Sequence, residues 1–198
     1  MIGVDRARRL ALRWIALLAL LPMLLAAPAS AATPGEIVEA VRGGGHVIYF
    51  RHGATTRSGI DRIEWPRERQ RLLSAEGVQQ SETIGAAFRE KGIPVGEVIA
   101  SPFARCRDMA EIMFGRVDER MELLGLLSDS EGREERVAFM REKATEPPAP
   151  GLNRVIVAHR SNIEAVADVT LAEGEAVVLR PDMAGGFAVL GTMMPEDW

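Results

Sequence analysis

The stretch HVIYFRHGATTRS, residues 46–58, runs a β-prone apolar segment directly into Arg51, His52 and Gly53. Apolar residues at successive positions are typical of a strand that is covered on both faces. Gly53 permits a positive φ or the close approach of a ligand to the backbone. The chain then adds hydroxyl groups at Thr55, Thr56 and Ser58. A guanidinium and an imidazole are therefore expected at the end of a buried strand.

The rest of the chain alternates short apolar runs with longer segments of helical spacing. The further apolar runs, bounded by glycine, proline or charged residues, cover residues 95–101, 154–159, 175–180 and 187–192. Helical spacing is found in residues 34–42, 75–91, 104–114, 131–144 and 161–170. Alternation of this kind is typical of parallel sheets with helices on both faces. We expect an α/β fold, a three-layer α/β/α sandwich with a mostly parallel central sheet.

Residues 1–32 have the three parts of an export signal. Four arginines precede an apolar segment, residues 14–25, and the small residues Ala29, Ser30 and Ala31 follow it. An uncleaved anchor is the alternative, but the apolar run is short and contains Pro22, whereas a spanning helix needs about 20 apolar residues. We therefore expect a signal peptide over residues 1–32 and one domain over residues 33–198, located in the periplasm or secreted. No membrane span is expected after cleavage.

The charge balance argues against a nucleic-acid partner. The chain has 24 Lys and Arg against 28 Asp and Glu, and without residues 1–32 its formal charge is −7. Nucleic-acid binding proteins usually show a basic surplus or stripe. Local arginine clusters can still bind small anions, so a small phosphorylated molecule is the expected partner. The sequence carries no signal for an oligomeric state.

Cys106 is the single cysteine and cannot form an intramolecular disulfide. Its neighbours Arg105 and Arg107 would favour a thiolate. A thiol enzyme also needs a base held beside the cysteine. We interpret Cys106 as a small buried side chain.

Basic and hydroxyl side chains follow three of the predicted strands. Arg51 and His52 follow the first, Arg105 lies shortly after the second, and His159 and Ser161 follow the strand over residues 154–159. The carboxyl ends of parallel strands meet at one edge of a sheet, where ligands bind. Guanidinium groups bind phosphoryl oxygens through paired hydrogen bonds. The sequence therefore predicts a phosphate site at this edge.

The chain resembles the histidine phosphatase superfamily, in its phosphoglycerate-mutase-like group. The matching residues are Arg51-His52-Gly53 with Thr55 and Ser58, then LLSAEGVQQSETIGAAF, SPFAR with Arg105, and VIVAH with His159. They occur in the order found in the family. They cover nearly the whole chain after residue 32.

This resemblance implies a role for each matching residue. His52 would be the nucleophile, forming a phosphohistidine that water later hydrolyses. Arg51, Arg105 and His159 would hold the phosphoryl oxygens and stabilise the transition state. Gly53, Thr55 and Ser58 would complete the phosphate-binding group. No cofactor and no metal are expected. The cationic side chains already compensate the negative charge of a phosphoryl group, and no two histidines have the i, i+4 spacing of a zinc site.

The general acid is where the sequence departs from the family pattern. The family usually has a glutamate shortly after a DER-L-x-E run, whereas residues 118–124 read DERMELL. Glu122 is one place early and is the first candidate proton donor, with Asp129 as the second. A solvated surface carboxylate is the alternative for both. The acid-phosphatase branch often has His-Asp at the second histidine, whereas this chain has His159-Arg160.

Together these features predict an exported, metal-independent phosphatase that hydrolyses phosphomonoesters. Sugar phosphates and cell-envelope phosphates are candidate substrates. A mutase is less favoured, because it needs a bisphosphate primer that an extracytoplasmic space does not readily supply. The alternative is a catalytically weak phospho-ligand-binding protein that retained the pocket and lost the acid.

Overall fold

The computed structural model describes residues 32–127, 132–182 and 184–198 of the chain. These residues belong to one compact unit. The predicted signal peptide lies outside them, apart from Ala32. No helix within the described ranges is long and apolar enough to cross a membrane.

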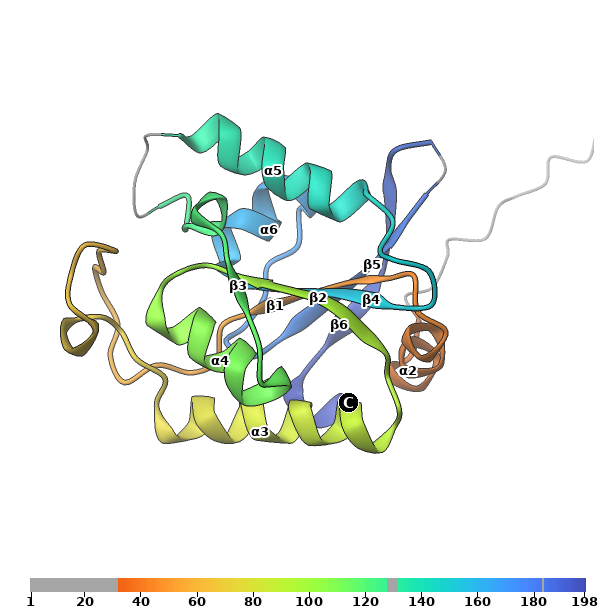
Figure 1. Cartoon of the computed structure of the whole chain (residues 1–198), viewed down its shortest axis with the longest axis horizontal. Helices are drawn as coiled ribbons and strands as arrows, with labels where there is room; N and C mark the ends of the chain where they lie inside the picture. Colours follow the sequence, from red (N-terminus) through yellow and green to blue (C-terminus); the bar gives the residue numbers. More distant parts are fainter. Residues whose placement is uncertain (1–31, 128–131, 183) are drawn as a thin grey trace, which may run out of the picture. The chain divides into compact units, whose positions relative to one another are not determined.

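A six-stranded sheet with the order β3-β2-β4-β1-β5-β6 forms the centre of the unit (Figure 1). β1, β2, β3 and β4 pair in parallel, whereas β5 runs antiparallel to β1 and to β6. This confirms the mostly parallel sheet. The strands are β1 (Val47–Arg51), β2 (Val95–Ala100), β3 (Asp118–Glu119), β4 (Asn153–Ala158), β5 (Ala176–Pro181) and β6 (Phe187–Met193).

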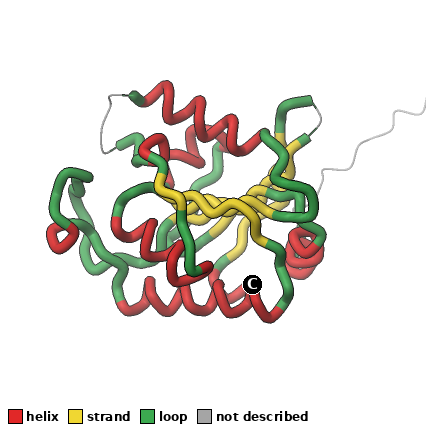
Figure 2. Tube along the Cα trace, viewed as in Figure 1, coloured by secondary structure: helices red, strands yellow, loops and turns green. Residues whose placement is uncertain are grey.

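Helices cover both faces of the sheet, as Figures 1 and 2 show. The helices are α2 (Pro34–Arg42), α3 (Ala75–Glu90), α4 (Ala104–Phe114), α5 (Arg133–Thr145) and α6 (Arg160–Ala167). One core joins α2, α3 and α4 to Ile48 and Phe50 of β1, and a second core joins α5 and α6 to Val47 and Tyr49. Successive side chains of a strand point to opposite faces, so β1 is apolar at consecutive positions because both faces are covered. The three-layer α/β/α architecture is confirmed.

Local signals account for the starts of the first two helices. Thr33 and Glu36 form a capping box at the start of α2, and the Ser74 hydroxyl accepts a hydrogen bond from the Gly77 N–H at the start of α3. A helix is stabilised when a side chain satisfies its first N–H groups. α6 ends at Ala167, three residues earlier than expected, because Asp168 adopts the left-handed conformation with φ of 54°.

Some short elements carried no clear sequence signal. β3 has only two residues, both charged and exposed, so no apolar pattern marks it. It extends the edge of β2 through the pairs Ile99 with Asp118 and Ala100 with Glu119. The 3-10 helices are η1 (Arg67–Arg69), η2 (Met121–Leu123) and η3 (Pro195–Asp197).

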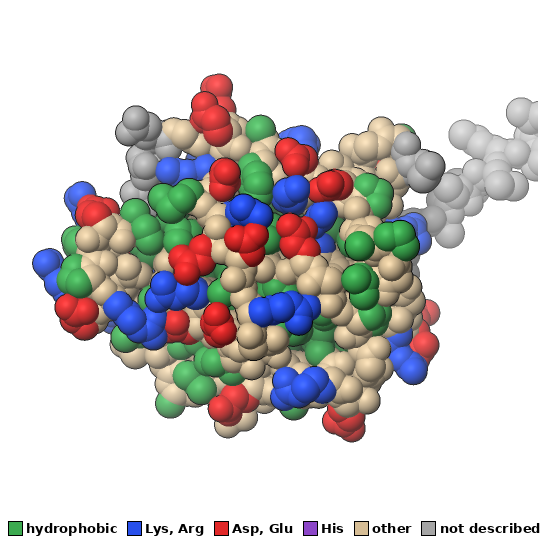
Figure 3. All heavy atoms as spheres, viewed as in Figure 1, with side chains coloured by type: hydrophobic (Ala, Val, Ile, Leu, Met, Phe, Trp, Pro, Cys, Tyr) green, Lys and Arg blue, Asp and Glu red, His purple; other side chains and the backbone are tan. Residues whose placement is uncertain are grey.

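Strand register brings the candidate site residues together. Arg51 pairs with Ala158 across β1 and β4, and Ala100 pairs with Val157 across β2 and β4. The next residues along these strands, His52, Ser101 and His159, therefore emerge at the same edge. Elsewhere, acidic and basic side chains are interspersed over the face in Figure 3.

Candidate active site

His52 is held as a neutral imidazole directly after β1. It is 3% exposed, and its backbone N–H donates to the Ala158 carbonyl at 3.0 Å. Its Nδ1 lies 2.9 Å from the Gly53 carbonyl oxygen, which only accepts hydrogen bonds, so Nδ1 carries the proton. Burial, reinforced by the Arg105 charge, lowers the pKa of His52 to about 3. At neutral pH, Nε2 therefore has an available lone pair.

His159 lies beside His52 in a defined tautomer of its own. The two ring centroids are 5.6 Å apart. Arg105 Nη2 donates to His159 Nδ1 at 3.2 Å, so the ring proton is on Nε2, which donates to the Ser101 hydroxyl at 2.9 Å. Burial and then the Arg105 charge hold the pKa of His159 well below its ordinary value. The Tyr49 hydroxyl also donates to the His159 carbonyl at 2.7 Å, which positions the backbone.

Arg105 lies in the first turn of α4, as predicted, and forms a buried ion pair with Asp61. Arg105 Nη1 donates to Asp61 Oδ2 at 2.5 Å, while Arg105 Nε is buried without a partner. The Asp61 carboxylate also accepts from the backbone N–H groups of Arg71 at 3.0 Å and Arg62 at 3.1 Å. Sequence reasoning did not single out Asp61, because one aspartate in a charged connection has no distinguishing pattern.

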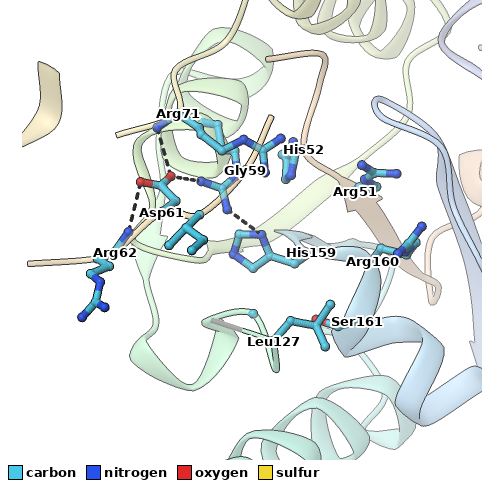
Figure 4. Close-up of a pocket in the computed structure, with 13 residues that line it drawn as sticks. Arg51, His52, Gly59, Asp61, Arg62, Arg71, Leu127, His159, Arg160 and Ser161 are labelled. Atoms are coloured by element: carbon cyan, nitrogen blue, oxygen red, sulfur yellow. Dashed lines mark hydrogen bonds and ion pairs between the residues drawn. The ribbon is translucent and has the colours of Figure 1, made fainter. Parts of the chain in front are cut away.

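These groups line a cavity of about 640 Å³ (Figure 4). Asp61 is the only carboxylate among the described residues that line it. Such an excess of guanidinium groups around an imidazole suits a phosphoryl group. The arginines in the lining are Arg51, Arg62, Arg71, Arg105 and Arg160.

Two of these arginines share one acidic partner, Glu173, which does not belong to the cavity lining. Arg51 donates to the Leu171 carbonyl at 2.9 Å and to Glu173 Oε1 at 3.2 Å. Arg71 donates to the same Glu173 oxygen at 3.3 Å and to the Thr55 hydroxyl at 2.7 Å. A guanidinium has five N–H donors, so both side chains keep donors for a bound anion.

Gly53, Thr55 and Ser58, predicted to bind phosphate, do not belong to the cavity lining. A side chain on Gly53 would place its Cβ 3.1 Å from the Gly77 Cα, so Gly53 packs tightly against the start of α3. Thr55 holds Arg71, as described above. Ser58 is exposed.

Glu122, the first candidate proton donor, is not brought to the cavity by the described structure. Glu122 is exposed on η2, whereas the adjacent Leu123 is fully buried in the core beneath α5 and α6. Gly125 and Leu127 of the same segment line the cavity, but Glu122 does not. Burial of Leu123 therefore leaves Glu122 on the outer side of the turn. Asp129 lies outside the described residues.

Cys106 is buried behind His159. Its Sγ lies 3.8 Å from the Ala158 carbonyl oxygen and 3.9 Å from His159 Nε2. Burial raises the pKa of the Cys106 thiol to about 12. The side chain is therefore a protonated, packed thiol at neutral pH. In the part of the chain that the structure describes, no three His, Cys, Asp or Glu residues group as metal ligands.

The family model of the histidine phosphatase superfamily (branch 1) matches residues 47–170. This match spans more than half of the chain and includes His52, Arg105 and His159. The chain belongs to the histidine phosphatase superfamily. It is an enzyme of the histidine phosphatase class. No protein with a curated description matches the chain in sequence.

Solved structures of phosphatases share the fold. The protein histidine phosphatase SixA, solved with tungstate, has a TM-score of 0.59 at 14% identity, over 77% of this chain and 98% of SixA. The alpha-ribazole phosphatase from Shigella flexneri has a TM-score of 0.55 at 14% identity, over 73% of this chain and 94% of that one. The phosphoserine phosphatase from Entamoeba histolytica, solved with phosphoserine, has a TM-score of 0.53 at 12% identity, over 77% of this chain and 98% of that one.

Proposed function

We propose that this phosphatase hydrolyses phosphomonoesters of small molecules and that His52 carries the phosphoryl group between two chemical steps. The observation that carries the proposal is the neutral His52 imidazole, which has Nδ1 bound to the Gly53 carbonyl and lies in an arginine-lined cavity. A histidine nucleophile needs an unprotonated nitrogen and a fixed tautomer. Membership of the phosphatase family favours this enzyme over a protein that only binds phosphorylated ligands.

In the first step, His52 Nε2 attacks phosphorus. The N–P bond forms as the bond from phosphorus to the leaving oxygen breaks, and that oxygen departs with the electron pair. Arg105, Arg51 and Arg71 stabilise the negative charge on the phosphoryl oxygens by charge-assisted hydrogen bonds. Because Glu122 does not line the cavity, the leaving oxygen takes its proton from another donor in this proposal, either Asp129, the second candidate, or water.

His159 acts in this scheme through Arg105. In the tautomer described above, His159 Nδ1 accepts from Arg105 and Nε2 donates to Ser101. The ring therefore holds the guanidinium against the cavity. A direct contact between His159 and the phosphoryl group would require the Arg105 contact to open.

In the second step, a water molecule attacks phosphorus and releases one proton to the solvent, which restores the proton that the leaving oxygen took up in the first step. The new P–O bond forms while the P–N bond breaks, and His52 recovers its lone pair at Nε2. The products are inorganic phosphate and the free enzyme. The same three arginines stabilise this transition state, because the phosphoryl oxygens keep their places in both steps.

Metal independence and export also belong to this proposal. The lining arginines supply the positive charge that a metal ion supplies in other phosphatases. Export rests on the pattern of residues 1–32. Mass spectrometry of the native protein should find an N-terminus at Ala32 or Thr33, and a full-length chain in the membrane fraction would contradict export.

Trapping of the intermediate tests the proposed function. The enzyme is mixed with an aryl phosphate and quenched within milliseconds, and the protein is analysed for acid-labile phosphate. We expect a phosphoenzyme with the phosphoryl group on His52. Phosphate release without such a species, or a phosphoryl group on another residue, would contradict the proposal.

A further inference from the structure

Two exposed aliphatic side chains line the cavity. Four large hydrophobic side chains are exposed in the described ranges, and two of them, Ile60 at 76% and Leu127 at 82%, belong to the cavity lining. The others, Met121 at 57% and Val189 at 44%, lie outside it. Ile60 comes from the connection between β1 and α3, and Leu127 follows η2. Two separate connections therefore each place an apolar side chain beside the phosphate-binding groups.

Apart from His52 Nε2, the described side chains of the lining that can accept hydrogen bonds each already accept at least one. The Asp61 carboxylate accepts from Arg105 and from two backbone N–H groups. The Ser161 hydroxyl, which lies near Leu127 in Figure 4, accepts from the Leu126 N–H at 3.0 Å. Most of the other polar side chains in the lining are arginines, which only donate hydrogen bonds. The described side chains of the lining therefore offer many hydrogen-bond donors and few acceptors, whereas a sugar hydroxyl needs both, so the lining is better suited to an apolar group than to a sugar.

We propose that the cavity takes phosphomonoesters whose leaving group is apolar next to the phosphate, an aryl or alkyl group, and that Ile60 and Leu127 cover this group. The inference rests on the proposed function, because it places the phosphoryl group beside His52. A volume of about 640 Å³ leaves room for a leaving group beyond the phosphoryl group. Removing the surface of the two aliphatic side chains from water favours binding in proportion to the area covered.

Binding of alkylphosphonates tests the inference without any turnover. The P–C bond is not hydrolysed, so affinity is measured directly by calorimetry. We compare methylphosphonate with hexylphosphonate, which carry the same anionic group. Wild-type protein should bind hexylphosphonate at least about tenfold more tightly, a ratio that corresponds to roughly 1.4 kcal/mol.

The variants Ile60→Ser and Leu127→Ser should each lower the ratio of the two affinities. The ratio cancels a general loss of anion binding, so it reports on the alkyl chain alone. Met121→Ser is the matched control, because Met121 is an exposed apolar side chain outside the cavity lining. This control should keep the wild-type ratio.

Three results would overturn the inference. The first is equal affinity of the wild type for the two phosphonates, and the second is an affinity ratio that falls as much in Met121→Ser as in Ile60→Ser and Leu127→Ser. The third is a higher kcat/KM for glucose 6-phosphate than for phenyl phosphate. The outcome remains distinguishable from that of the proposed function. A chain-length preference without hydrolysis of any phosphomonoester supports the apolar subsite and contradicts the phosphatase mechanism. Hydrolysis through a phosphohistidine without any chain-length preference supports the phosphatase mechanism and contradicts the apolar subsite.

Discussion

Asp61 Oδ2 and Arg105 Nη1 lie 2.5 Å apart in an ion pair whose side chains are only 3% and 4% exposed. The pair joins the connection between β1 and α3 to the first turn of α4. Asp61 and His159 thereby hold Arg105 through two of its five N–H donors, while its Nε is buried without a partner. A guanidinium that is already oriented loses less freedom when it binds a phosphoryl oxygen. The ion pair with Asp61 therefore orients the Arg105 guanidinium before an anion binds.

Asp61→Asn should destabilise the protein and make it more responsive to phosphate. Removing one partner of a buried ion pair leaves an uncompensated charge and costs about 3–5 kcal/mol. Added phosphate supplies a new anionic partner for Arg105, so the rise in Tm on adding phosphate should be larger in the variant than in the wild type. Thermal unfolding with and without phosphate measures both effects.

Asp108→Asn is the control for this prediction. Its partner Arg67 is 52% exposed, and the N–O distance is 2.6 Å. Asp108 is 21% exposed, so breaking this half-exposed pair should cost about 1 kcal/mol, well below the cost for the buried pair. If Asp61→Asn had the same stability and the same response to phosphate as Asp108→Asn, the buried pair would not orient Arg105.

The variants His52→Ala and Arg105→Ala should separate the nucleophile from electrostatic stabilisation. His52→Ala removes the attacking atom, so turnover should fall by at least about a thousandfold and the acid-labile phosphoenzyme should disappear. Arg105→Ala should slow the chemistry and weaken phosphate binding, yet leave some phosphohistidine detectable, because Nε2 of His52 remains. Rapid-quench trapping on both variants checks this. A phosphoenzyme that still forms in His52→Ala would refute the mechanism.

Glu122→Gln should leave hydrolysis nearly unchanged. The sequence favours Glu122 as the proton donor, but the structure places it exposed on η2 and away from the cavity lining. A general acid must reach the leaving oxygen within hydrogen-bond distance. The measurement is kcat/KM for an alkyl phosphate and for an aryl phosphate with a good leaving group. A loss confined to the alkyl phosphate would restore Glu122 as the donor.

Stability should fall below pH 6.5 in a way that depends on His52. The folded protein holds the pKa of His52 at about 3, whereas an unfolded histidine titrates near 6.5. Between these values the unfolded chain binds the extra proton, so lowering the pH favours unfolding by up to about 1.4 kcal/mol per pH unit. His52→Gln lacks this contribution. Urea unfolding at pH 7 and pH 5 should therefore show a smaller loss for the variant, and equal losses would contradict the neutral buried imidazole.

Phosphatase activity should survive a chelator and be inhibited by vanadate. Arginines supply positive charge around the proposed phosphoryl site, and vanadate mimics the five-coordinate phosphorus of an attack by His52. Assays after prolonged incubation with chelator test the first part. Abolition of activity, with recovery on adding zinc or magnesium, would contradict metal independence.

Local patterns in the sequence were sufficient to predict the layers of the fold and to predict that His52, Arg105 and His159 lie at one edge of the sheet. The five apolar runs became strands, and in β1 and β4 the continuous apolar residues are covered on both faces as expected. His52 and His159 each follow a predicted strand, and the carboxyl ends of parallel strands meet at one edge of a sheet, so their meeting could be expected; the pairing of β1 with β4 places them there. The position of Arg105 in the first turn of α4 also follows from its sequence neighbourhood.

The path of the connections and the direction of individual side chains were not predictable in this way. Asp61 meets Arg105 across 44 residues of sequence, through a connection with no periodic pattern. Glu122 lies outside the cavity because the adjacent Leu123 is drawn into the core. The tautomers of His52 and His159 depend on the Gly53 carbonyl and the Arg105 guanidinium. These features arise from contacts between distant segments, whereas strand and helix patterns arise from neighbours along the chain.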